Sequence, residues 1–342
     1  MITTVLNIEK LEEAIARGYI HKCKHPEANL WIYNYTQATQ YERYWTKETL
    51  QCRGLILDEN YTVIAHSIPK FFNIEEVGYS ALPNEPYKVY EKMDGSLGIL
   101  YWLDRTPYIA TRGSFTSKQA KKANDLLQSK YASIIKNLDK SKTYVFEIVY
   151  PENRIIVDYG TEEALVLIAI VDTKTGKTEA LKNIGFPLPQ VYSYNSLSEL
   201  KALNWKNKEG FVIQYENGFR VKIKFEDYID LHKIVTQISS LTIWETLKEE
   251  GELTQWIEDV PDEFFTWVKK VETQLREKFK TIETISKAEY KELSTDRDTA
   301  SYFKACTYPA VLFAIKNRKN YDKIIWKYIR PVFEKAYSNE FN

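Results

Sequence analysis

The sequence contains little cysteine and no long apolar stretch. Only three cysteines occur among 342 residues, and they are far apart in the chain. So few thiols argue against a disulfide-stabilised secreted fold and favour reduced cysteines in the cytoplasm. No window approaches the roughly 20 consecutive apolar residues of a membrane span, and the N-terminus lacks the basic and apolar regions of a signal peptide. We therefore expect a cytoplasmic protein without a membrane partner.

The chain also has a formal net charge of zero, because 47 basic side chains balance 47 acidic ones. No global field draws the chain to nucleic acid, so any basic binding site must be local. The glycine-rich loop G-x-x-x-x-G-K-[ST] is absent, which argues against a P-loop ATPase or kinase. Aromatic residues are abundant instead, with 25 tyrosines and 8 tryptophans. This composition indicates a packed globular protein rather than a disordered one.

The first two thirds of the chain have a strand-like pattern of short β-branched and aromatic runs bounded by turn residues. The clearest runs are 55–57, 96–102, 144–150, 165–171, 211–215 and 219–225. Apolar residues at helical spacing predict a helix over 117–138, and a second one over 8–17 that Gly18 would end. Strands and helices together predict a mixed α+β domain.

After about residue 226 the pattern becomes helical. Phe264, Trp267 and Val268 begin an apolar stripe that recurs every three or four residues as far as Ile282, and Pro261-Asp262 would start that helix. Similar patterns occupy 229–247 and 300–336. We therefore predict two domains, an α+β domain at 1–235 and an all-helical domain at 236–342 that could take part in RNA recognition.

The segment Lys92-Met93-Asp94-Gly95-Ser96 lies between two apolar runs and predicts a turn that closes a β-hairpin. A lysine at a strand end, followed by an acid, a glycine and a hydroxyl, suits an unusual reaction. The amine attacks the α-phosphorus of a nucleoside triphosphate and keeps the nucleoside monophosphate. Such a lysine requires nearby positive charge or desolvation to lower its pKa. The triphosphate requires positive charge at the same place, because negative charge develops on the leaving pyrophosphate.

That charge is present in the strand run 219–225. With a strand period of two, Arg220, Lys222 and Lys224 share one face, while Val221 and Ile223 point into the core. Three cations on one face favour a phosphate-binding surface. A solvated edge strand that resists aggregation remains the alternative.

Glu147 lies in the hydrophobic run 144–150, where both faces of the strand are otherwise apolar. A carboxylate is costly in such a place unless it binds something, so we interpret Glu147 as a functional residue. A second acid, Glu209, precedes Gly210 at the start of another strand.

These segments occur in a definite order with three others, Arg53-Gly54, Lys70-Phe71-Phe72-Asn73 and Arg112-Gly113-Ser114. As a set they resemble the covalent nucleotidyltransferases, which comprise ATP-dependent DNA ligases, RNA ligases and mRNA capping enzymes. The likeness is strongest to the phage T4-type RNA ligase 1 family and covers roughly residues 30–230. It implies a nucleotidyltransferase domain, ATP-grasp-like, of antiparallel sheets with flanking helices, followed by the all-α domain.

The resemblance implies a role for each matching residue. The catalytic residues would be Lys92, Lys222 and Lys224. The ATP contacts would be Tyr35, Arg53, Lys70, Glu91, Arg112, Glu147, Ile168 and Val212. The metal would be oriented by Asp94 and Glu209. In this scheme Lys92 is adenylylated, Glu147 holds the ribose, and adenine lies between Ile168 and Val212. Arg112 stands where this branch often has lysine, which puts the detail of its contact in doubt.

The implied activity is ATP-dependent ligation of RNA 5′-phosphate and 3′-hydroxyl ends through lysyl-AMP and an adenylylated RNA end, in RNA or tRNA repair. The partners would be ATP and RNA, with Mg²⁺ or Mn²⁺ and without an obligate protein partner. A DNA ligase, a GTP-dependent capping-type enzyme and a catalytically silent nucleic-acid-binding module remain alternatives. The helical pattern after Phe225 argues against the first two, which usually continue into a β-barrel domain.

Overall fold

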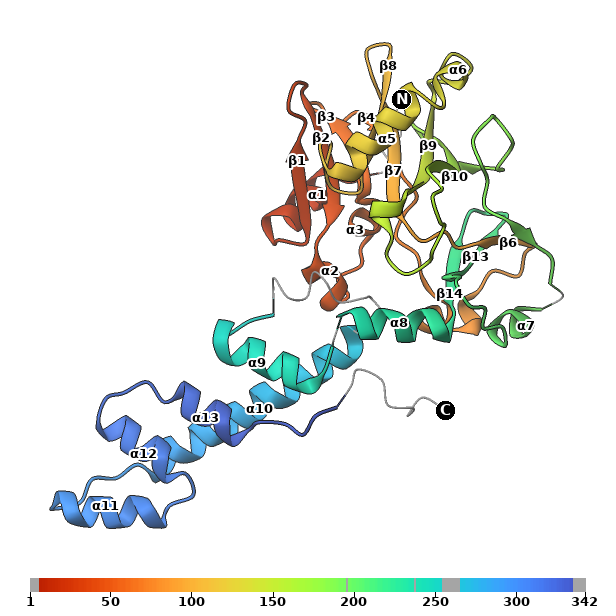
Figure 1. The fold of residues 1–342 in the computed structure, drawn as a ribbon. Helices are drawn as coiled ribbons and strands as arrows, with labels where there is room; N and C mark the ends of the chain where they lie inside the picture. Colours follow the sequence, from red (N-terminus) through yellow and green to blue (C-terminus); the bar gives the residue numbers. More distant parts are fainter. Residues whose placement is uncertain (1–5, 195, 237, 254–264, 335–342) are drawn as a thin grey trace. The chain divides into compact units, whose positions relative to one another are not determined.

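A computed structural model describes residues 6–194, 196–236, 238–253 and 265–334. The chain divides into two compact units, Met1–His232 and Lys233–Asn342. The first unit contains three β-sheets with helices on their outer faces (Figure 1). In the described residues, no helix combines the length and apolar character that crossing a bilayer requires.

The first sheet has the strand order β1-β2-β3-β4, and all its pairs are antiparallel. Its strands are β1 (Ile20–Lys24), β2 (Leu30–Tyr35), β3 (Arg53–Asp58) and β4 (Val63–Ala65). Short helices α2 (Gln37–Tyr41) and α3 (Lys47–Gln51) connect β2 to β3. Helix α1 (Ile8–Ala16) packs its apolar side, including Leu11, against this sheet, and Gly18 follows with φ of 78° as the predicted stop signal.

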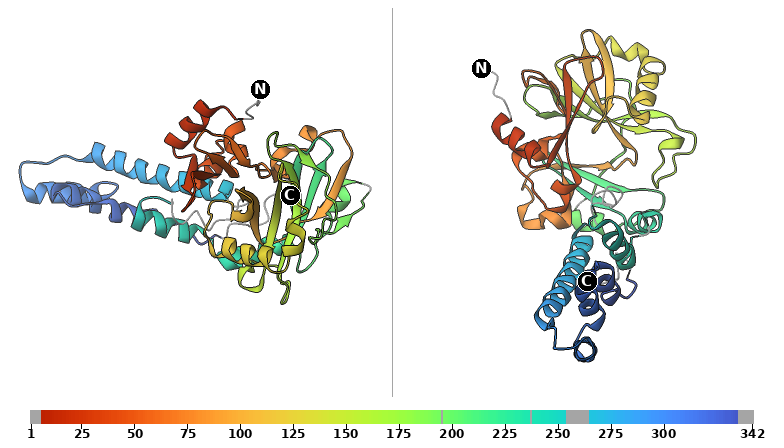
Figure 2. Two further views of the ribbon diagram at one scale, coloured as in Figure 1. Left: turned by 90° about the horizontal axis from the view of Figure 1, so that it is seen from above. Right: turned by 90° about the vertical axis from the view of Figure 1, so that its left-hand side faces the viewer.

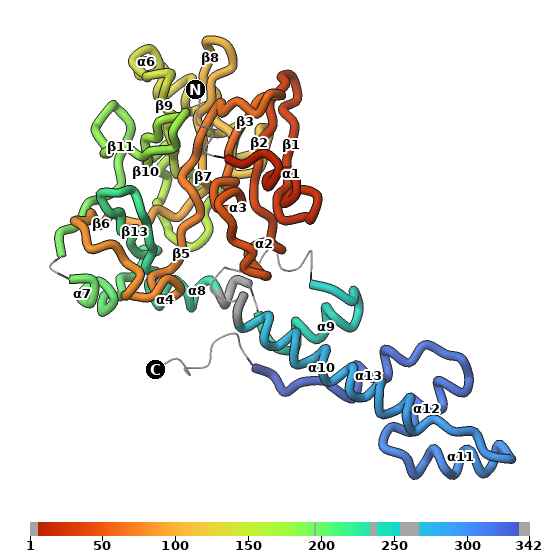
Figure 3. Tube along the Cα trace, turned by 180° about the vertical axis from the view of Figure 1, so that it is seen from behind, coloured from red at the N-terminus to blue at the C-terminus, as the bar shows by residue number. Residues whose placement is uncertain are grey.

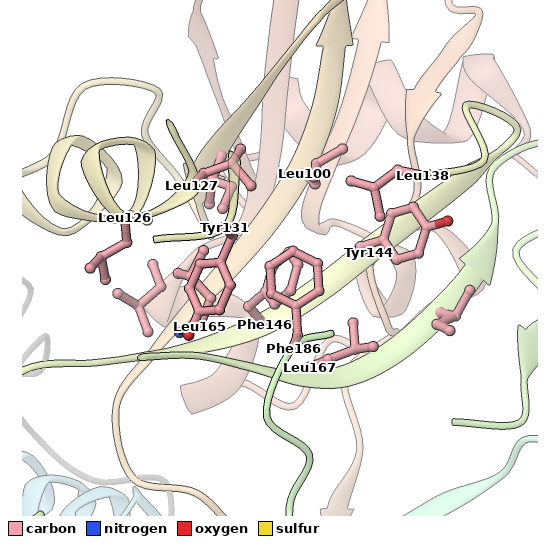
Figure 4. Close-up of a cluster of buried hydrophobic side chains, with 14 residues drawn as sticks. Leu100, Leu126, Leu127, Tyr131, Leu138, Tyr144, Phe146, Leu165, Leu167 and Phe186 are labelled. Atoms are coloured by element: carbon pink, nitrogen blue, oxygen red, sulfur yellow. Dashed lines mark hydrogen bonds between the residues drawn. The ribbon is translucent and has the colours of Figure 1, made fainter. Parts of the chain in front are cut away.

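The second sheet has the order β11-β10-β9-β7-β8 and is entirely antiparallel. Its strands are β7 (Ser96–Leu103), β8 (Thr106–Thr111), β9 (Lys142–Val149), β10 (Ala164–Asp172) and β11 (Thr178–Glu179). Helices α5 (Lys118–Gln128) and α6 (Ala132–Ile135) cover one face, where Leu126, Leu127 and Tyr131 meet Phe146 and Leu165 (Figure 4). The opposite face packs against the first sheet.

The third sheet has the order β12-β6-β13-β14-β5. Its strands are β5 (Phe72–Asn73), β6 (Tyr87–Glu91), β12 (Val191–Tyr192), β13 (Gly210–Tyr215) and β14 (Arg220–Lys224). All pairs are antiparallel except β14 with β5, which run parallel. Figure 3 shows β6 and β13 beside one another. The short elements around this sheet are α4 (Ile74–Val77), α7 (Leu197–Lys201) and the 3₁₀ turns Tyr79–Ala81 and Pro151–Asn153.

Helix α8 (Glu226–Thr236) spans the boundary between the units. The described part of the second unit then contains α9 (Ser240–Glu250), α10 (Phe265–Glu289), α11 (Asp296–Ala305), α12 (Pro309–Lys316) and α13 (Asp322–Tyr328). Within this unit α9, α12 and α13 pack against the long α10, which can be followed in Figure 2. The predicted helix start at Pro261-Asp262 and the stripe residue Phe264 lie outside the described residues, and the all-α class of this domain stays a prediction.

Two sequence predictions differ from the structure. The helix expected over 117–138 is two helices, since α5 ends at Gln128 and α6 begins at Ala132. The break allows Tyr131 to turn inward, where its ring packs 4.7 Å from that of Phe186 and its hydroxyl accepts a hydrogen bond from Leu165. The expected hairpin around Lys92 is also wrong, because β6 and β7 belong to different sheets.

The buried ring of Phe146 provides a test of the core on β9. It is fully buried and lies 4.8 Å from the ring of Phe186. We expect Phe146→Ala to lower the free energy of unfolding by about 3–5 kcal/mol, because the cavity cannot close completely. Urea unfolding monitored by circular dichroism measures this loss. Phe219→Ala, at a position 38% exposed, is the matched control and should cost less than about 1 kcal/mol.

Candidate active site

The turn from Lys92 to Gly95 leads the chain from the third sheet into the second. The Lys92 backbone N–H donates to the Gly210 carbonyl at 2.9 Å, which holds the turn against the start of β13. The Lys92 Nζ lies 2.8 Å from Glu209 Oε2, and the Lys224 Nζ lies 3.4 Å from Glu209 Oε1. One carboxylate with a side chain only 4% exposed therefore binds two lysines that lie far apart in the sequence.

Gly210 makes this arrangement sterically feasible. Its φ is 147°, and a Cβ there would lie 2.0 Å from the Ile223 carbonyl oxygen on the neighbouring strand. Only glycine permits that approach, which brings β13 and β14 together next to Glu209. The Glu-Gly pair noted in the sequence is therefore a geometric requirement of the two-lysine contact.

Gly95 joins the turn to β9. Its N–H donates to Glu147 Oε1 at 3.1 Å, and a Cβ on Gly95 would lie 2.5 Å from the Ile148 carbonyl oxygen. The lysine-bearing turn thus lies directly on the strand that carries Glu147. As predicted, the other residues of that strand pack into apolar clusters on both faces.

Glu147 is a half-buried carboxylate with a perturbed proton affinity. Burial raises the pKa of Glu147 to about 7, Glu209 and Asp94 contribute in the same direction, and Lys92 and Arg53 oppose the shift. A carboxyl group whose pKa lies near neutral pH, within a cluster of charged side chains, is typical of a functional site. Because Lys92 lowers this pKa, the Glu147 carboxyl and the Lys92 ammonium lie close enough to interact electrostatically.

Asp94 binds protein groups through both carboxylate oxygens. Its Oδ2 accepts hydrogen bonds from the backbone N–H groups of Ile156 and Val157, at 2.9 and 2.8 Å, and its Oδ1 accepts one from the Tyr228 hydroxyl at 2.9 Å. The Asp94 N–H donates to the Tyr159 hydroxyl at 2.8 Å. Asp94 therefore positions the turn, the following loop and the start of α8, and its metal role stays a prediction.

Arg53 and Arg112 form a second basic group together with Tyr35. Arg112 donates to the Tyr35 hydroxyl at 3.3 Å, and its guanidinium lies 5.3 Å from the centre of that ring. The Arg53 Nη1 is buried and has no hydrogen-bond partner. Burial lowers the pKa of Arg53, and repulsion from Arg112 adds to this effect, while Tyr35 and Glu147 oppose it. A buried guanidinium N–H with no acceptor is available for an anionic ligand.

Lys70 projects into an aromatic group that also contains Tyr35. Its Nζ lies 5.5–5.6 Å from the ring centres of Tyr35, Trp45 and Phe72 and donates to Gln40 Oε1 at 3.0 Å. Cation–π contact holds the ammonium without neutralising it. Tyr35 consequently contacts both Lys70 and Arg112, and its role as an ATP contact stays a prediction.

Lys222 and Arg220 are each only 7% exposed. Strand β14 lies between β13 and β5, so the alternative of a solvated edge strand is wrong. In the register, Lys222 pairs with Asn73 on β5 and Val212 on β13. The segment Lys70 to Asn73 is thereby brought beside the Lys-x-Lys strand, although about 150 residues separate them in the chain.

The predicted nucleoside contacts come from two sheets. Ile168 is the extra residue of a β-bulge in β10 and belongs to a small apolar cluster with Met93 and Tyr159. Val212 is half-buried on β13, opposite Tyr90. Their joint contact with adenine stays a prediction. Glu91, directly before Lys92, forms an ion pair with Lys208.

Several residues with prominent contacts in this site carried no signal in the sequence. They are Gln40, Trp45, Tyr159, Lys208 and Tyr228, and Arg220 was noticed only as a member of the cationic strand. Each acts through a partner distant in the chain, so spacing alone could not reveal it. Within the described ranges, no group of three or more His, Cys, Asp or Glu side chains could hold a metal ion. A divalent ion at Asp94 and Glu209 would therefore need ligands from a phosphate substrate and water.

Comparison with known proteins identifies relatives of part of this chain. Residues 51–228 match the T4 type 1 family of RNA ligases. A protein of Autographa californica nuclear polyhedrosis virus, described as a bifunctional polynucleotide kinase/RNA ligase, is 30% identical, over 59% of this chain and 34% of the viral protein. An RNA ligase of Rhodothermus phage RM378 is 26% identical, over 64% of this chain and 67% of the phage protein. The chain thus spans about a third of the viral relative.

Among solved structures, a mutant of the RNA ligase of Naegleria gruberi with AMP and Mn is similar at 15% identity, with a TM-score of 0.41. The similar region covers 49% of this chain and 58% of that one. The same protein with pyrophosphate gives a TM-score of 0.36 at 16% identity, over 44% and 52% of the two chains.

The raised pKa of Glu147 predicts a pH-dependent stability. The folded protein favours the protonated acid, so its stabilising effect is complete below pH 4.5 and is lost as the pH rises through about 7. Glu147→Gln removes this dependence. We expect the free energy of unfolding of the nucleotide-free variant to exceed that of the wild type by roughly 2–3 kcal/mol at pH 8 and to equal it near pH 4.5.

Urea titrations at several pH values between 4.5 and 8 measure this difference. Glu162→Gln, at an exposed position, is the control for simple loss of a carboxylate. A constant difference between the wild type and Glu147→Gln over this range would contradict the role of burial.

Proposed function

The chain belongs to the T4 type 1 RNA ligase family, and from this membership we propose that it is an ATP-dependent RNA ligase. In our proposal it seals RNA 5′-phosphate and 3′-hydroxyl ends through a covalent lysyl-AMP and an adenylylated RNA 5′ end. The observation that carries the proposal is the contact of Glu209 with both Lys92 and Lys224, at 2.8 and 3.4 Å. Through this contact one largely buried carboxylate binds both the proposed nucleophile, Lys92, and a proposed phosphate-binding cation, Lys224.

The charge of the site supports a triphosphate as ligand. Its cationic side chains are Lys70, Lys92, Lys222, Lys224, Arg53, Arg112 and Arg220. Three carboxylates, Asp94, Glu147 and Glu209, stand against these seven cations. The remaining excess of positive charge, in a chain without net charge, matches a ligand with about four negative charges.

In the first step the Lys92 amine attacks the α-phosphorus of ATP. A P–N bond forms, the bond from that phosphorus to the bridging oxygen breaks, and pyrophosphate leaves with the electron pair. The ammonium must first lose a proton, and the Glu209 carboxylate at 2.8 Å is within reach to accept it. The nitrogen loses a second proton, to the departing pyrophosphate or to water, once the P–N bond has formed. Lys222 and Lys224 stabilise the charge on the α-phosphate, and Arg53 and Lys70 bind the pyrophosphate as it departs.

Bound with the triphosphate near Asp94 and Glu209, Mg²⁺ or Mn²⁺ would neutralise part of the phosphate charge. Glu147 binds the ribose, and Ile168 and Val212 contact the adenine. In the second step an RNA 5′-phosphate oxygen attacks the lysyl-AMP phosphorus, and the P–N bond breaks as Lys92 recovers a proton. In the third step a 3′-hydroxyl attacks the activated 5′ phosphorus, and AMP leaves. Positioning and electrostatics supply most of the catalysis.

We infer a role in the repair of broken RNA, with tRNA as one candidate, because these end groups arise when cleaved RNA has been healed. The viral relative is described as carrying a polynucleotide kinase, an activity that supplies 5′-phosphates. In our proposal another activity prepares the ends, and the second unit contributes to RNA recognition.

The test is incubation with divalent metal and ATP labelled at the α-phosphate, followed by a denaturing gel. We expect an acid-labile labelled band in the wild type and none in Lys92→Ala, because the nucleophile is removed. Lys121→Ala, an exposed lysine on α5, is the matched control and should retain the label. A labelled band in Lys92→Ala would contradict the assignment of Lys92 as the nucleophile.

A chase of the labelled wild-type protein with 5′-phosphorylated RNA tests the later steps. We expect the label to pass to the RNA 5′ end and then to appear as free AMP as ligated or circular RNA forms. Transfer only to nicked DNA would instead identify a DNA ligase, and labelling by GTP alone would identify a capping-type enzyme. Absence of any label after pyrophosphate treatment would favour a silent binding module.

A further inference from the structure

Arg220 is a buried cation whose described partners are all neutral. The guanidinium donates to Thr178 Oγ1 through both terminal nitrogens at 3.3 Å, to Gln214 Oε1 at 3.1 Å and to the Gly218 carbonyl at 3.4 Å. Among the described residues no carboxylate forms an ion pair with it, and the residue is only 7% exposed. An uncompensated buried charge destabilises a folded protein, so its presence requires an explanation.

The neighbouring charges increase the free-energy cost of burying the Arg220 guanidinium. Burial lowers the pKa of Arg220 to about 10, and repulsion from Arg53 adds to the effect, while Tyr90 opposes it. Arg220 is still protonated at neutral pH. Since Arg53 also contains a buried nitrogen without an acceptor, two guanidinium groups from different sheets lie close enough to repel each other, and neither forms an ion pair with a carboxylate among the described residues. A bound polyanion would offset the positive charge of both guanidinium groups.

The hydrogen bonds of Arg220 join two sheets. Arg220 and Gln214 lie on β14 and β13 of the third sheet, whereas Thr178 lies on β11 of the second. Arg220 and Lys222 share one face of β14 and are two residues apart, which is about 7 Å along a strand. The guanidinium is therefore held on the same face of β14 as Lys222, with its donors directed at protein acceptors.

We propose that Arg220 is a positioning residue that tunes the site for a triphosphate. Its buried charge, fixed by Thr178 and Gln214 between the second and third sheets, adds positive potential behind Lys222 and favours ATP over nucleotides with fewer phosphates. Arg220 acts through the field and through the placement of β14, without touching the reacting atoms. This inference rests on the proposed function, because it concerns the same nucleotide site.

The test compares nucleotides that differ in charge. Dissociation constants for ATP, ADP and AMP are measured by titration calorimetry in a Lys92→Ala background, where no adenylate forms. We expect Arg220→Met to weaken ATP binding by about tenfold and AMP binding by less than about threefold, because the interaction grows with ligand charge. Arg220→Lys, which keeps the charge, should retain ATP affinity within about threefold. Arg105→Met, at an exposed turn, is the matched control.

Equal losses for ATP and AMP would show a purely structural role and overturn the proposal, as would unchanged affinities. Thermal unfolding establishes that each variant is folded. If Arg220→Met does not fold, Thr178→Val and Gln214→Leu release the guanidinium without removing it and are measured in the same way. A larger loss for ATP than for AMP then supports the proposal, and equal or absent losses overturn it.

The result also separates this inference from the function on which it rests. A Lys92→Ala parent that binds no nucleotide would defeat both. A parent that binds ATP, combined with an Arg220→Met variant that shows no charge-dependent loss, would overturn only the role of Arg220.

Discussion

The ion pairs of Glu209 with Lys92 and Lys224 are the constraint on which the site depends. Lys92 directly follows β6 of the third sheet, Lys224 ends β14 of that sheet, and the turn that begins at Lys92 continues into the second sheet. A single buried carboxylate therefore holds the turn that leads from the third sheet into the second. Burying it is tolerable because two cations share it, and the cations are held close because it is there.

The glycines of the turn and of β13 follow from the same constraint. Gly95 lies against the Ile148 carbonyl and donates to Glu147, and Gly210 lies against the Ile223 carbonyl. A side chain at either position would push apart the strands that carry the charged groups. Asp94 performs the complementary task, since its two oxygens hold the loop after β9 and Tyr228 of α8. The turn motif thus unites the lysine that we propose as the nucleophile with two architectural residues, Asp94 and Gly95.

Several cations of the site lie in unusual surroundings. Lys70 is surrounded by aromatic rings, Arg53 contains a buried nitrogen without an acceptor, and Arg220 has only neutral partners. For Arg220, neutral contacts hold the side chain in place but leave its charge available to a ligand. A site satisfied by carboxylates would be more stable in isolation and would attract a polyanion less strongly.

Much of this was available from the sequence. The strand patterns around 55–57, 144–150 and 219–225 correspond to β3, β9 and β14, because alternation and β-branched residues report local burial. Glu147 could be recognised because a carboxylate interrupts an apolar strand on both faces. The order of the charged motifs indicated the family to which the chain belongs.

What the sequence by itself determined was thus the local structure and the identity of the charged residues, since both follow from neighbouring side chains. Only the tertiary structure decided that the Lys92 turn connects two sheets, that Asp94 accepts hydrogen bonds from Ile156, Val157 and Tyr228, and that Arg220 reaches Thr178. These contacts join residues 42 to 134 positions apart. No periodicity encodes such pairs, because they arise when separately formed sheets pack against one another.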